Sequence, residues 1–196
     1  MSFLGDVRLV LRISRAQQIA RRYFVTNGFD GALTMLGLAL GFYVGDAVSM
    51  RTVVNVCVGV AIALMMSGLS SAYISESAER RRELLDLKQA MVADLGDSAH
   101  ERAARYVPWL IAAVNGIAPF LMAMAVVMPL WLAILGVPLP VPPLQAAIAL
   151  GFVVIFLLGV FLGRVSGTFW LWSATRTLLI GGVTAALILL VDIDSG

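Results

Sequence analysis

Charge is scarce in this sequence. Asp, Glu, Lys and Arg make up 13% of the 196 residues, whereas hydrophobic residues make up 60%. A soluble domain of this length needs far more charge to keep its surface in contact with water. The scarcity therefore excludes an ordinary soluble protein. It predicts one compact domain in a lipid bilayer, without room for a separate soluble module.

Cysteine and histidine each occur only once. The lone Cys57 lies in an apolar run, which excludes a disulfide framework, and the lone His100 excludes a histidine-based metal cluster. The sequence also has no nucleophile–base constellation, no phosphate-binding loop and no pair of carboxylates inside an apolar run. We therefore expect no enzyme, no covalent cofactor and no nucleic-acid partner. Residues 1–22 lack the central apolar run of a cleavable signal peptide, so we expect none.

Five apolar runs are long enough to cross the hydrocarbon core of a membrane, which takes roughly 20 helical residues. They cover residues 23–44, 52–75, 106–128, 144–162 and 170–191, and we expect the third to continue past Pro129 to Leu135. The four prolines within residues 136–143 predict a tight turn. Residues 163–167 are expected to be a short connection. The predicted fold class is all-α, with five transmembrane helices.

The distribution of basic residues predicts the orientation of these helices. Only Arg51, of 14 basic residues, falls between the first and second runs. The others precede the first run, lie between the second and third, or flank the connection of the fourth and fifth. Because Lys and Arg collect in cytoplasmic loops, we expect the amino terminus inside and the carboxyl terminus outside. This predicts a multi-pass protein of a prokaryotic cell membrane.

Two segments are expected to be helical outside the hydrocarbon core. Within residues 1–22, residues 3–19 place apolar side chains on one face and arginines around it, which indicates an amphipathic helix on the cytoplasmic surface. Anchoring to lipid headgroups is one interpretation of this helix, and a regulatory role is the other. Residues 76–105 are expected to be a polar cytoplasmic helical linker, broken near residues 96–98. The remaining ranges, 23–75 and 106–196, hold the transmembrane helices.

Asp30 is an ionisable residue inside the first apolar run. It lies roughly 10 Å along that helix, on the same turn as Asn27 and between two glycines. A carboxylate beside a side-chain amide suits a hard cation or a proton relay, and a charge in a membrane is costly enough to indicate function. The alternative interpretation is an ion pair with Arg176, which lies at a similar depth at the start of the fifth run.

The first run also contains glycines at four-residue spacing, namely Gly37, Gly41 and Gly45. This spacing lets two helices pack closely and indicates a helix–helix seam, which we expect at a dimer axis. Five spans cannot form two equal inverted halves. A central pathway would therefore most simply lie between two protomers.

Two further groups are candidates for a metal pathway. Met65 and Met66 carry thioethers that favour transition metals, although methionine also fills gaps between helices. Asn115 lies near Gly116 and Pro119, which we expect to disturb the helical hydrogen bonds and expose carbonyls.

Carboxylates recur along one predicted helical face after the second run. Glu76, Glu79, Glu83 and Asp86 share this face, and arginines between them permit Glu76–Arg80 and Glu79–Arg82 pairing. Oxygen ligands along one side of a helix could collect divalent cations. The alternative is a solvated face stabilised by salt bridges.

Several of these motifs together resemble the vacuolar iron transporter family, which includes the yeast Ccc-type and plant transporters. Residues 27–34 (NGFDGALT) are similar to its first-helix signature, and residues 66–77 (MSGLSSAYISES) to the end of its second helix. Residues 115–119 (NGIAP) resemble its third-helix element, and residues 159–167 and 173–186 its last two helices. The resemblance covers roughly residues 20–190 and would make the chain a divergent, short, prokaryotic-like member.

The resemblance implies a homodimer that exports Fe²⁺, Mn²⁺ or a related cytosolic cation in exchange for protons. Asp30 would match the family's first-helix metal carboxylate, Met66 its second-helix methionine, and Glu76, Glu79 and Glu83 the start of its metal-collecting helices. The family's acidic residue two turns before the methionine is replaced here by Gly59, Val60 and Ala61. We expect a divalent metal transporter. The alternative is a non-transporting membrane scaffold or lipid-interacting protein with the same fold.

Overall fold

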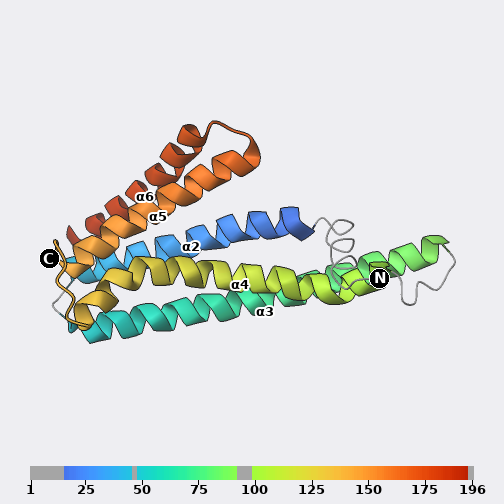
Figure 1. The fold of residues 1–196 in the computed structure, drawn as a ribbon, viewed down its shortest axis with the longest axis horizontal. Helices are drawn as coiled ribbons and strands as arrows, with labels where there is room; N and C mark the ends of the chain where they lie inside the picture. Colours follow the sequence, from blue (N-terminus) through green and yellow to red (C-terminus); the bar gives the residue numbers. More distant parts are fainter. Residues whose placement is uncertain (1–15, 46–47, 92–98, 194–196) are drawn as a thin grey trace. The chain divides into compact units, whose positions relative to one another are not determined.

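The computed structural model describes residues 16–45, 48–91 and 99–193. Within these ranges the chain forms helices and no strands, as the sequence predicts (Figure 1). The helices are α2 (Ala16–Val44), α3 (Met50–Met91), α4 (Ala99–Ile134), α5 (Pro143–Ser166) and α6 (Trp170–Ile193). The expected amphipathic helix over residues 3–19 lies largely outside the described residues, and so does the expected break at residues 96–98.

Four of these helices are long and apolar enough to cross a membrane. They are α3 to α6, with apolar stretches inside Met50–Ala90, Ala104–Ile134, Pro143–Ser166 and Trp170–Val191. The chain therefore has the character of a membrane protein, with four helices able to span a bilayer among its described residues. Helix α2 is not among them, because Asn27, Asp30 and several glycines lower its hydropathy. Its expected crossing, and the orientation of the termini, stay predictions.

Helix α3 joins two segments that the sequence distinguishes by polarity. It runs unbroken for 42 residues, so the second apolar run and the linker from Glu76 to Met91 form one helix. The linker is rich in Glu, Arg and Leu, which favour helix, and it contains neither Gly nor Pro before Gly96. This part of the linker is helical as predicted. The rest of the linker after residue 98 begins α4.

Helix α4 continues through three prolines, Pro108, Pro119 and Pro129. It ends at Ile134, which confirms the expected continuation past Pro129. A proline has no N–H to donate, so each removes one bond of the helical ladder. Helix α4 nevertheless runs without a break through Asn115 and Gly116. Pro119 has no N–H for the Asn115 carbonyl, which is the disturbed hydrogen bond that we expected there.

Helices α5 and α6 form an antiparallel pair that lies side by side (Figure 1). The turn before α5 contains Gly136 with a positive φ of 78° and leads into Pro142 and Pro143, as the proline-rich stretch predicts. Helix α5 ends at Ser166 and is capped by Gly167, whose φ is 70°. Residues 163–166, which we expected to be a connection, are therefore helical. The prediction was wrong because α6 packs directly against Gly163, which favours a further turn of α5.

The described helices belong to two compact units. Unit one comprises the described residues of Met1–Phe24 and Met65–Ile117, and unit two those of Val25–Leu64 and Ala118–Gly196. In unit one, Val107 and Ile111 form a buried cluster against Ile19 and Tyr23. In unit two, a Cβ on Gly159 would lie only 2.7 Å from the Ala174 Cα, so α5 and α6 meet almost backbone to backbone.

Candidate functional site

Asp30 lies on the exposed side of α2, in unit two. Its two glycine neighbours face the other way. A Cβ on Gly31 would lie 2.7 Å from the Pro119 Cα, and one on Gly28 would lie 3.3 Å from the Met122 side chain. The packing face of α2 is therefore the glycine face, and this contact fixes Asp30 on the opposite side. The carboxylate is presented at the surface of unit two.

The structure does not bring the predicted counter-ion to Asp30. The Arg176 guanidinium lies over the ring of Trp172, 4.8 Å from its centroid, one turn earlier on α6. The ion pairs found among the described residues involve Arg80, and none joins Asp30 to Arg176. Within unit two, Asp30 is thus exposed rather than neutralised by this arginine.

Asn27 lies in unit two with Asp30, and its Nδ2 donates to the Thr26 hydroxyl at 3.5 Å. The remaining predicted pathway residues lie in unit one. Met66 is 55% exposed and points away from the packed helices, whereas Met65 is half-buried. The Met65 carbonyl oxygen lies 2.6 Å from where a Cβ on Gly116 would be. The backbone of Met65 therefore contacts α4 where α3 and α4 cross. The thioether of Met66 is the one of the two that remains accessible.

Asn115 links α3 and α4 at this crossing. Its Nδ2 donates a hydrogen bond of 2.7 Å to the carbonyl of Gly68, and the side chain is buried. A Cβ on Gly68 would lie 2.6 Å from the Asn115 carbonyl oxygen. Since Pro119 cannot donate to that oxygen, the approach of Gly68 covers a carbonyl without its helical partner. Asn115 thus fixes two helices together in this structure.

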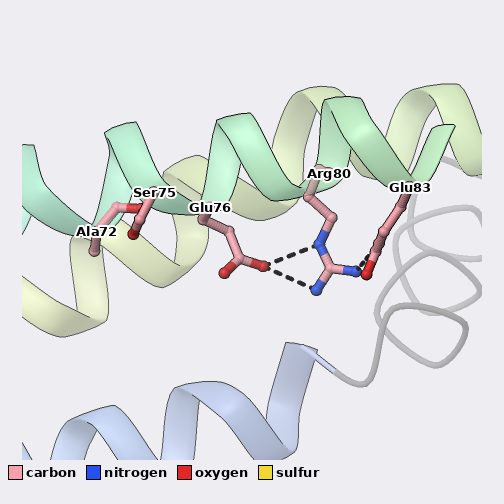
Figure 2. A network of polar contacts seen from close by, with 5 residues as sticks. All are labelled: Ala72, Ser75, Glu76, Arg80 and Glu83. Carbon is pink, nitrogen blue, oxygen red and sulfur yellow. Dashed lines mark hydrogen bonds and ion pairs between the residues drawn. The ribbon is translucent and has the colours of Figure 1, made fainter. Parts of the chain in front are cut away.

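The predicted carboxylate face of α3 is organised by one arginine (Figure 2). Arg80 Nε donates to Glu76 Oε1 at 2.9 Å, its Nη2 lies 2.8 Å from the same oxygen, and its Nη1 lies 2.8 Å from Glu83 Oε2. Glu76 is only 6% exposed. The predicted Glu76–Arg80 pair is confirmed. Glu79 and Arg82 are both exposed, and the second carboxylate on Arg80 is Glu83.

This network limits the ability of the carboxylate face to bind a metal cation. Two of the three carboxylates expected to collect metal already accept charge-assisted hydrogen bonds from one guanidinium, which are the strong kind. A cation would have to displace Arg80 to reach Glu76. Among the described residues no group of three or more His, Cys, Asp or Glu side chains is placed to hold a metal ion. The face resembles the salt-bridged alternative more than an ion collector.

Among the described residues of unit two, the predicted glycine seam on α2 is mostly open. Gly37 faces the Ile188 side chain at 3.6 Å, whereas nothing lies within 4 Å of a Cβ on Gly41. The closest helix contacts occur instead at Gly31, one of the two glycines beside Asp30, and at Gly159, which sequence reasoning did not single out. A signal was present for the second, because Gly159 and Gly163 repeat the four-residue spacing of small residues.

Comparison with protein-family models, with curated proteins and with solved structures finds no match to this chain. The resemblance to vacuolar iron transporters therefore stays a prediction from the motifs themselves.

Proposed function

We propose that this protein is a homodimeric membrane transporter that exports a divalent cation such as Fe²⁺ or Mn²⁺ in exchange for protons. The observation that supports this proposal is Asp30. Its carboxylate is exposed on a helix whose sequence is otherwise apolar from Phe29 to Val44, and no described arginine or lysine forms an ion pair with it. An unpaired charge in such a helix is costly and indicates a function.

A second protomer would supply the oxygen ligands for a divalent cation that one protomer lacks. One carboxylate is too few oxygen ligands for a divalent cation, which takes about six. Two Asp30 residues with two Asn27 amides, brought together at α2, would provide a fuller set. The open surface at Gly41 suits the close approach of a second α2.

Proton coupling would use the same carboxylates. A protonated Asp30 cannot hold the cation, so protonation from the outer side would release the ion, and loss of the proton would restore the site. Export of the metal and inward flow of protons would then alternate at one group.

The test is metal uptake into inside-out proteoliposomes. We expect Asp30→Asn, which keeps the shape and removes the charge, to lower uptake of Mn²⁺ at least about a hundredfold, since it removes a direct ligand. Asp86→Asn, an exposed carboxylate on the linker part of α3, is the matched control and is expected to retain uptake. Unchanged uptake by the Asp30 variant would exclude this mechanism.

A second candidate function is a membrane scaffold without transport. The Glu76–Arg80–Glu83 network favours it, because these carboxylates are occupied by an internal cation. The two functions differ in metal binding. A transporter requires saturable Mn²⁺ or Fe²⁺ binding that depends on Asp30, whereas a scaffold shows none in the same titration.

A further inference from the structure

The turn between α5 and α6 carries exposed aromatic and basic side chains. The aromatic ones are Phe169, Trp170 and Trp172, exposed by 65%, 42% and 59%. Arg164, in the last turn of α5, and Arg176, in the second turn of α6, are also exposed. We refer to these five residues as the turn cluster. Exposed tryptophans at the end of apolar helices are typical of the boundary between membrane and water.

The backbone that carries the turn cluster is tightly held. The N–H groups of Gly167 and Thr168 both donate to the Gly163 carbonyl, the second at 3.0 Å. A Cβ on Gly163 would lie 2.7 Å from the Trp170 Cα. The aromatic and basic side chains therefore project from a fixed hairpin rather than from a long loop.

The two faces of α6 differ in what they contact. Ser173, Ala174 and Thr177 are buried against α5, and the Thr177 hydroxyl donates to the Ile155 carbonyl at 3.2 Å. Trp172 and Arg176 lie on the outward side. Arg176 folds back one turn toward the start of α6 to stack on Trp172, as an arginine does when it reaches from an apolar helix toward the headgroups.

The turn cluster has an excess of positive charge. Residues 160–180 contain the two arginines and no Asp or Glu. Neither arginine forms an ion pair with any residue that the structure describes. A guanidinium presents several N–H donors in a plane, which matches the oxygens of a phosphate.

A shallow apolar groove on the outward face of α6 begins beside the turn cluster. It is lined by Thr175, Leu178, Leu179, Gly182, Val183 and Ala186. The groove exists because Gly182 and Ala186 have small side chains between larger ones. Its apolar lining, next to two arginines at a membrane boundary, matches an acyl chain attached to a charged headgroup.

We propose that the turn cluster and this groove bind one anionic phospholipid. Arg164 and Arg176 contact the phosphate, the aromatic rings lie at the headgroup level, and an acyl chain follows the groove along α6. The site is separate from Asp30 and does not depend on transport.

Lipid binding is measured by native mass spectrometry of the detergent-solubilised protein, titrated with phosphatidylglycerol or phosphatidylcholine. Each basic residue near an anionic lipid surface strengthens binding about fivefold, so we expect Arg164→Gln with Arg176→Gln to weaken phosphatidylglycerol binding about thirtyfold. Arg51→Gln removes an exposed arginine elsewhere in unit two and is expected to leave the affinity unchanged. Equal loss in this control, or no loss in the double variant, would overturn the proposal.

Two further measurements separate a lipid from other occupants. Gly182→Leu fills the groove and is expected to weaken long-chain phosphatidylglycerol while sparing a short-chain analogue. Glycerol phosphate alone should bind at least about a hundredfold more weakly than the lipid, because it lacks the acyl contacts. If it binds as tightly, the site is for a soluble phosphate and the proposal is wrong. Arg176→Lys keeps the charge and should restore part of the binding, which excludes misfolding as the cause.

Discussion

Gly31 and Gly41 lie on the same helix in opposite surroundings. A Cβ on Gly31 would overlap the backbone of Pro119, whereas nothing lies within 4 Å of one on Gly41. At Gly31 the missing side chain sets the distance between α2 and α4, and so holds the neighbouring Asp30 in place. At Gly41 the missing side chain leaves a flat exposed surface.

This contrast gives a paired prediction on stability. Gly31→Ala forces the two backbones apart, so we expect it to lower the free energy of unfolding by about 1–3 kcal/mol. In the monomer, Gly41→Ala meets no neighbour among the described residues and raises helix propensity, so it should raise the free energy of unfolding of the monomer by up to about 1 kcal/mol. Both are measured by reversible unfolding in mixed micelles. A loss of stability in both variants would contradict the description of Gly41 as open.

Some side-chain contacts could be predicted from the sequence and others could not. The Glu76–Arg80 pair was predictable because side chains four apart on a helix are neighbours. The second ion pair, between Arg80 and Glu83, was not predictable, because spacing alone permits several partners for Arg80. The hydrogen bond from Asn115 to Gly68 joins residues 47 positions apart, and no local pattern indicates it.

At the scale of one element, the linker part of α3 depends on its buried ion pair. Glu76 and Arg80 have side-chain exposures of 7% and 12%, so removing one partner leaves a charge with little water around it. Such a loss costs about 1–3 kcal/mol. Glu79, one turn along, is exposed and provides a comparison within the same helix.

We therefore expect Glu76→Ala to destabilise the helix around residues 76–90, with faster amide hydrogen exchange there by about tenfold or more. Glu79→Ala is expected to change exchange rates little, because surface substitutions usually cost less than about 0.5 kcal/mol. Equal acceleration in both variants would mean that the Arg80 network does not hold this segment.

Element boundaries followed the sequence where proline and glycine set the backbone, and they departed from it where packing between helices decides. Prolines and Gly136 mark the turn before α5 correctly, because their backbone preferences are local. The end of α5 was misplaced by a few residues, since Gly163 looks like a breaker in sequence but packs against Trp170 in space. The polar–apolar change at residue 76 marks no break in α3, because polarity and helix propensity are separate properties.

At the scale of the whole molecule, the proposed dimer predicts contact between two copies of α2. In a Cys57→Ala background, Gly41→Cys is expected to form a disulfide between protomers in native membranes. Val153→Cys, which lies on α5 and is 49% exposed, is the comparison and should cross-link far more slowly. Non-reducing electrophoresis measures both rates. Similar rates would indicate random collision and contradict a dimer seam at α2.

The unbroken length of α3 has a mechanical consequence. A helix of 42 residues is about 63 Å long, roughly twice the thickness of a bilayer core. Helix α3 contacts α4 at Gly68, and about 35 Å of helix lies between this contact and Met91. A tilt of about 5° at this contact would move the far end of α3 by about 3 Å, so a small change in packing at Gly68 becomes a larger displacement at Met91.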